Sequence, residues 1–92
     1  MRTIQVYKSY SFKDKDPVID ILRTAVQKSG LSYGRIQELS GVHRGTMNEW
    51  FNGVTMRPKF ASVQAVAHAL GLEFRLVEGK NWRRARHLRV VA

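Results

Sequence analysis

Side chains that hydrogen-bond to nucleic-acid bases are concentrated between residues 43 and 53. Asn48 and Glu49 follow Arg44 by four and five residues, so a helix would place all three on one exposed face. Arginine fits the O6 and N7 acceptors of guanine, and a carboxylate accepts a hydrogen bond from cytosine N4. We therefore predict base contacts by these side chains, with a close backbone approach at Gly45, which has no side chain.

Other roles are open for the same residues. The alternative for Arg44 is a phosphate contact, because much of the hydrogen bonding between proteins and DNA goes to the DNA backbone. Glu49 serves equally well as a solvated surface residue. Thr46 suits either a phosphate or the methyl group of thymine.

The start of another predicted helix is suited to a phosphate. Tyr33 and Arg35 lie in its first turn. Unpaired amide groups and the helix dipole attract anions at such a position. We therefore expect both residues to contact the DNA backbone.

Four helices are expected to carry these residues. Asp16 and Pro17 are a typical N-cap and first helical residue, and Gly30 is a typical residue after the last turn. Ser32 suits the cap of the second helix, and Gly41 suits a turn that needs a positive φ. The helices are expected at 17–29, 33–40, 43–52 and 61–70, with a core made by Ile19, Leu22, Val26, Ile36, Leu39, Val42, Met47, Trp50, Phe51, Val63, Val66, Ala67 and Leu70.

Both ends of the chain alternate apolar and polar residues, which favours short strands. The pattern covers residues 3–12 and 72–77, and a weaker version ends at Val90. The expected fold is therefore mainly α, a domain of four to five helices with short terminal β-strands. Its expected parts are an N-terminal strand or arm (1–15), the helical domain (16–71) and a basic C-terminal β extension (72–92).

Charge is concentrated at the two ends of this 92-residue chain, whose net charge is +9. The region 80–92 has five basic residues and no acidic one, which favours a partner of dense negative charge. Arg83, Arg84 and Arg86 are possible DNA contacts, although a basic tail can also serve solubility alone. The chain has no cysteine for a disulfide or a thiolate metal site, and no apolar run of the ~20 residues that span a bilayer. A cytoplasmic protein without membrane partners is expected.

Residues 32–71 resemble the lambda-repressor-like helix-turn-helix family (Cro/C1 type, XRE family), which includes phage repressors, Cro proteins and many type II antitoxins. The matching elements are I-x-x-L-x-G-V from Ile36, R-x-T-M-x-x-W-x-N-G from Arg44, R-P-K-F at 57–60 and A-x-A-L-G at 67–71. The resemblance implies that the helix at 43–52 enters the major groove. It also implies phosphate contacts by Asn52, Gly53, Arg57 and Lys59, with a solvated basic loop as the alternative for the last two.

Two residues depart from the family pattern. Gln37 stands where a small alanine is usual, so the helices must adjust or the side chain must tilt outward. His43 replaces the usual Ser or Thr cap of the recognition helix. Histidine caps less well, so this helix is expected to fray unless a phosphate contact at His43 organises it.

The sequence gives little basis for single-strand stacking, metal binding or catalysis. Trp50 and Phe51 could stack on single-stranded bases, but their spacing from Met47 favours the core, with Phe51 the less certain. His43, His68 and His87 have no metal-ligand spacing, and His68 is expected to face solvent. No Ser–His–Asp set or paired carboxylate site can be assembled, so no cofactor and no enzyme is expected.

Three functions are compatible with these features. The leading one is a sequence-specific double-stranded DNA-binding regulator, a repressor, acting as a homodimer. The second is an antitoxin that holds a toxin protein and represses its own promoter. The third is a basic accessory protein that binds DNA or RNA with little sequence preference.

Overall fold

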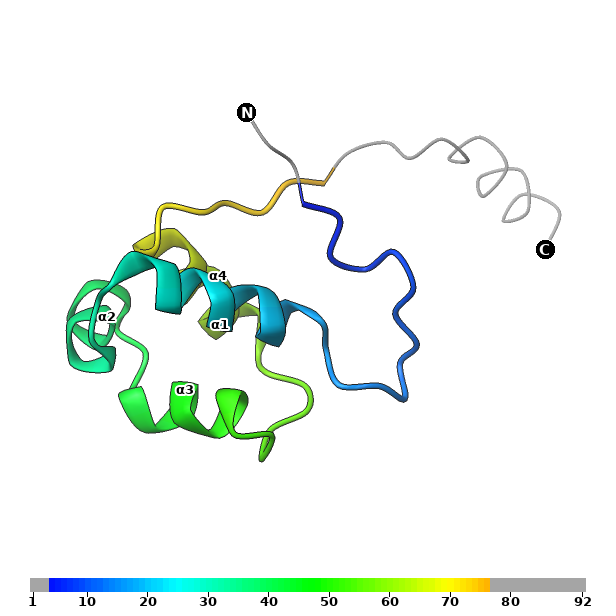
Figure 1. Cartoon of the computed structure of the whole chain (residues 1–92), viewed down its shortest axis with the longest axis horizontal. Helices are drawn as coiled ribbons and strands as arrows, with labels where there is room; N and C mark the ends of the chain where they lie inside the picture. The colour runs from blue at the N-terminus through cyan, green and yellow to red at the C-terminus, as the bar shows by residue number, and fades with distance from the viewer. Residues whose placement is uncertain (1–3, 77–92) are drawn as a thin grey trace, which may run out of the picture.

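The computed structural model describes residues 4–76, and these contain four α-helices and no strand. The helices are α1 (Val18–Ser29), α2 (Tyr33–Ser40), α3 (Arg44–Phe51) and α4 (Phe60–Ala69). Helix α2 packs against both α3 and α4, and α1 packs against α3 (Figure 1). The mainly α fold predicted from the sequence is confirmed, with four helices at the predicted places.

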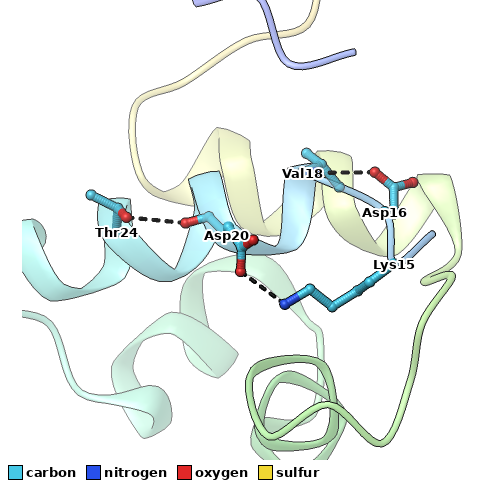
Figure 2. Close-up of polar contacts among 5 residues, drawn as sticks. All are labelled: Lys15, Asp16, Val18, Asp20 and Thr24. Atoms are coloured by element: carbon cyan, nitrogen blue, oxygen red, sulfur yellow. Dashed lines mark hydrogen bonds and ion pairs between the residues drawn. The ribbon is translucent and has the colours of Figure 1, made fainter. Parts of the chain in front are cut away.

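Helix α1 begins where a carboxylate satisfies one of its unpaired amides. Pro17 occupies the N-cap position with φ −64° and ψ −18°, values that already match a helix. The amide of Val18 donates to Asp16 Oδ1 at 3.0 Å, as Figure 2 shows. Asp16 therefore supplies a capping hydrogen bond, although Pro17 holds the N-cap position that the sequence predicted for Asp16. Pro17 loses nothing by lacking an amide proton.

The core lies between the four helices and is wholly apolar among the described residues. Ile36, Met47 and Val66 are fully inaccessible to solvent, and they come from α2, α3 and α4. Trp50 is the largest buried side chain and packs with them. The buried residues are Val18, Ile19, Leu22, Val26, Ile36, Met47, Trp50, Phe51, Val63, Val66 and Ala67.

The inner face of α2 differs from the predicted one. It passes through Tyr33, Ile36, Gln37 and Ser40, whose side chains are buried or partly buried. Leu39 points away from this face and is 49% exposed, so the prediction that it is buried is wrong. The spacing of Ile36 and Leu39 is compatible with a helix face, but the inner face here continues at i+4.

Positive φ at the turn between α2 and α3 is confirmed. Gly41 adopts φ 79°, a conformation that L-residues with side chains rarely take. Its amide donates to the carbonyl of Gln37 at 2.8 Å, which closes the last turn of α2. The chain can then reverse direction within three residues before α3 begins.

The predicted terminal strands are wrong for the residues that the structure describes. Residues 4–12 form bends and turns, and residues 72–76 pair with no other segment. The alternation in the second segment instead places Leu72 and Phe74 against the core, while Leu76 is exposed. Alternating burial needs only one packed side, whereas a strand also needs a hydrogen-bonded neighbour. Residues 1–3 and 77–92, including the third predicted strand, lie outside the described residues.

We predict that Asp16→Ala lowers the free energy of unfolding by about 1 kcal/mol, because Val18 then loses its capping acceptor. For a domain of this size the melting temperature should fall by about 4–8 °C. Asp14→Ala is the matched control, since the structure gives the exposed Asp14 side chain no hydrogen bond within residues 4–76. Thermal unfolding followed by circular dichroism measures both variants. Equal melting temperatures for the two would contradict the capping role.

Candidate nucleic-acid interface

Helix α3 has one face in the core and one in solvent. Met47, Trp50 and Phe51 are buried, which confirms the core interpretation of the two aromatic residues. Arg44, Asn48 and Glu49 are exposed on the other side, as their spacing predicts. Gly45 and Thr46 are partly buried at the first turn. The buried face therefore anchors the helix while the polar face stays available to a ligand.

Two side chains hold the first turn of α3. Gln37 Oε1 accepts from the amide of Arg44 at 3.0 Å, and His43 Nδ1 accepts from the amide of Gly45 at 3.0 Å. The amides of Thr46 and Met47 donate to the carbonyl of His43. The amides of the first four residues of α3 thus all have partners. Two side chains thus cap the first turn of α3, and the expected fraying at this end stays a prediction.

The histidine cap depends on the glycine two residues later. A Cβ added at Gly45 would lie 3.0 Å from His43 Nδ1 and 3.3 Å from its Cε1. These are tighter than ordinary van der Waals contacts, so a side chain at position 45 would press on the imidazole. Because Nδ1 accepts a hydrogen bond, the neutral ring carries its proton on Nε2. That second nitrogen is left as a donor.

The two departures from the family pattern therefore belong to one arrangement. Gln37 is long enough to reach across the turn to Arg44, where an alanine could not. His43 caps the next amide in place of the usual hydroxyl. Sequence reasoning noted both residues, but it missed the cap that Gln37 provides. The signal in the sequence that could have indicated this cap is a long amide side chain, Gln37, close to the glycine turn.

The start of α2 has the features expected of a phosphate site. Ser32 Oγ accepts from the amide of Arg35 at 3.1 Å, which confirms its capping role. Within residues 4–76 the amides of Tyr33 and Gly34 have no hydrogen-bond partner. The Tyr33 ring packs edge-on against Phe51, with centroids 5.9 Å apart. The Arg35 guanidinium is paired with Glu38 at 2.9 Å in an exposed contact.

The end of α3 brings two amide side chains together. Asn52 Nδ2 donates to Asn48 Oδ1 at 2.9 Å, and both residues are exposed. The carbonyl of Glu49 accepts from the amides of Val54 and Thr55, so the chain folds back over the last turn. Gly53 lies within this reversal with φ 80°.

The loop between α3 and α4 (residues 52–59) contains the last of the predicted phosphate ligands. Lys59 is exposed at the N-cap position of α4, and its side chain makes no capping hydrogen bond. The Arg57 guanidinium instead lies over the Phe12 ring, 4.3 Å from its centroid, and donates to the Phe12 backbone carbonyl. Sequence reasoning missed Phe12 because 45 residues separate this pair.

The remaining candidate residues lie elsewhere. His68 is exposed on α4, as predicted. Arg83, Arg84, Arg86 and His87 are outside the described residues. Within residues 4–76 no group of three His, Cys, Asp or Glu side chains could hold a metal ion, and no helix is long and apolar enough to cross a membrane.

These helices define a helix-turn-helix DNA-binding domain: α2, a glycine turn and a capped α3 with one polar face. A family model described as helix-turn-helix matches residues 22–77, which is more than half of the chain. The chain belongs to this family, the Cro/C1-type (XRE) helix-turn-helix regulators. Its domain is a DNA-binding regulatory one, generally without enzymatic activity. No curated protein and no solved structure matches the chain significantly.

We predict an energetic coupling between His43 and Gly45. In a helix Ala is normally more stable than Gly by about 0.5–1 kcal/mol, but Gly45→Ala should lose that gain because the new methyl group presses on the imidazole. In a His43→Ser background the serine still caps the helix and leaves room, so the gain should return. Urea unfolding of the four proteins should give a coupling of at least about 0.5 kcal/mol. Additive effects would show that the two positions are independent.

Proposed function

We propose that this protein is a sequence-specific transcriptional regulator, acting as a repressor, which reads the major groove of double-stranded DNA with α3. The observation that carries the proposal is the exposed polar face of a helix whose other face is fixed in the core. A base-reading side chain is selective only if its backbone is held in place. The capped first turn provides that fixation for Arg44.

The proposed base contacts are made by Arg44, Asn48 and Glu49, with the backbone at Gly45 close to the bases. Arg44 is exposed and has no ion-pair partner among the described residues, so its guanidinium is available to guanine. Asn48 Oδ1 accepts one hydrogen bond from Asn52, which leaves its second lone pair and its amide donors for a base edge.

The proposed phosphate contacts flank α3 on both sides. On one side are the amides at the start of α2 with Tyr33 and Arg35, where the N-terminal helix charge favours an anion. On the other side are Asn52, Gly53 and Lys59. His43 contributes through Nε2, its remaining donor, and Thr46 through its hydroxyl.

A homodimer on a two-fold symmetric operator completes the proposal. One recognition helix covers only a few base pairs, so two copies about one helical turn apart are needed for useful specificity. Residues 4–76 contain no strand whose edge could pair with a second copy, so within these residues other surfaces would have to form the dimer interface. We place the protein in the cytoplasm, where its DNA target is found.

An antitoxin is the second candidate, and one observation favours it. A shallow groove of about 510 Å³ runs along the outer side of α4, lined by Ala61, Gln64, Ala65, His68, Leu72, Glu73 and Phe74. This surface does not overlap the proposed DNA-binding residues, so a small protein partner and DNA could bind together. A toxin gene adjoining the coding sequence and co-purification of its product would favour this candidate.

Binding to DNA from the region upstream of the gene tests the leading proposal. We expect a complex at least ~10³-fold tighter than with a scrambled duplex, measured by fluorescence anisotropy at two salt concentrations. Light scattering of the complex should give two chains per duplex. Equal and salt-sensitive binding to both duplexes would indicate an accessory protein without sequence preference. No binding to either would contradict DNA binding by the protein alone and direct the search to a toxin partner.

Arg44→Ala should weaken binding to the preferred duplex by about 5- to 150-fold, the equivalent of 1–3 kcal/mol. The loss should be confined to one base position, where all four base pairs become nearly equal. Arg23→Ala is the control, since it removes one positive charge from an exposed position on α1. Uniform weakening on every sequence would instead assign Arg44 to a phosphate.

A further inference from the structure

The segment before α1 is folded onto the α3–α4 loop. We call residues 4–15 the N-terminal arm. Its Phe12 contacts Arg57 through both the ring and the backbone carbonyl. The next fixed point is Asp16, whose amide donates to the carbonyl of Met56 at 2.9 Å. Two consecutive loop residues therefore hold the end of the arm.

The arm is also packed within itself and against the start of α1. Tyr7 and Tyr10 meet edge-on with centroids 5.5 Å apart, and Val6 packs against the core. Partial burial of Tyr7, together with the nearby Asp16 carboxylate, raises the pKa of its hydroxyl to about 12. These contacts describe a segment with a defined position, although it contains no helix or strand.

The position of the arm extends one end of the proposed DNA-binding surface. In Figure 1 the arm descends beside the α3–α4 loop, at the end of α3 opposite to its junction with α2. Lys8 and Lys13 are exposed and form no ion pair within residues 4–76, and Lys13 directly follows the Phe12 contact. Lys15, by contrast, is paired with Asp20. The arm and loop together contain one acidic residue, Asp14.

We propose that the N-terminal arm is a second DNA-binding element, in which Lys8 and Lys13 bind phosphates beyond the base pairs contacted by α3. This inference rests on the proposed function and names a further part of the same interface. A duplex carries a phosphate every 3.4 Å along each strand, so a basic segment beside the interface finds further anionic partners.

Arg57 has a different role in this arrangement from the one that the sequence suggests. Its guanidinium is engaged by the ring and carbonyl of Phe12, so it holds the arm and leaves the phosphates to the lysines. Arg57 is then a positioning residue. Removing Arg57 should therefore also remove the phosphate contacts of Lys8 and Lys13, because the arm is no longer held in place.

The salt dependence of binding separates these roles, because each phosphate contact contributes a slope of about 0.9 to log K against log salt. Lys8→Ala/Lys13→Ala should lower the slope by about 1.8 per chain, which is about 3.6 for a dimer on one duplex. Phe12→Ala should lower it as much although it removes no charge, and Phe12→Tyr should restore it. Arg57→Ala should lower it similarly, with no further loss when combined with the double lysine variant. Arg23→Ala, on α1, should leave the slope unchanged.

The outcomes distinguish this inference from the proposed function. If the wild-type protein prefers one duplex but Phe12→Ala and the double lysine variant keep its slope, the arm does not bind DNA. If Arg57→Ala lowers the slope by only about 0.9 per chain, adds to the lysine variant and is not mimicked by Phe12→Ala, Arg57 itself contacts a phosphate. If the wild type binds all duplexes equally, sequence-specific regulation fails while the slopes still report on the arm. A wild type that binds no duplex overturns both proposals.

Discussion

The burial of one face of α3 is the constraint on which the interface depends. The helix has eight residues, too few to be stable alone in water. Met47, Trp50 and Phe51 fix it by packing into the core, and this leaves the polar face at a set angle to the rest of the domain. The buried residues do not contact a ligand, but their packing determines where the side chains of the polar face lie.

Packing fixes the helix axis, whereas hydrogen bonds fix where the helix begins. The turn after Gly41 could end in several conformations, but acceptors on Gln37 and His43 select one of them. The same logic applies at the other end, where amides of the α3–α4 loop return to the carbonyl of Glu49. The loop is thereby held in a position where Arg57 can reach Phe12. Local hydrogen bonds thus connect the recognition helix with the N-terminal arm.

The helices were predictable from the sequence, because apolar spacing and end residues carry local information. Asp16, Ser32 and Gly41 act within a few residues of their own position, and their roles are confirmed. The strands were mispredicted, since an alternating pattern shows which side is packed but contains no information on a pairing partner. The Gln37–Arg44 and Arg57–Phe12 contacts depend on how distant elements meet, so spacing along the chain could not reveal them.

The histidine cap has a consequence for how the recognised DNA sequence can change during evolution. Position 45 lies next to Arg44 in the first turn of α3, so a new side chain there would be one way to alter preference. His43 opposes that step, because its ring occupies the space that a Cβ would need. A smaller capping residue at position 43 should therefore make substitutions at position 45 less costly. The two positions are expected to change together, so a library that varies position 45 should vary position 43 as well.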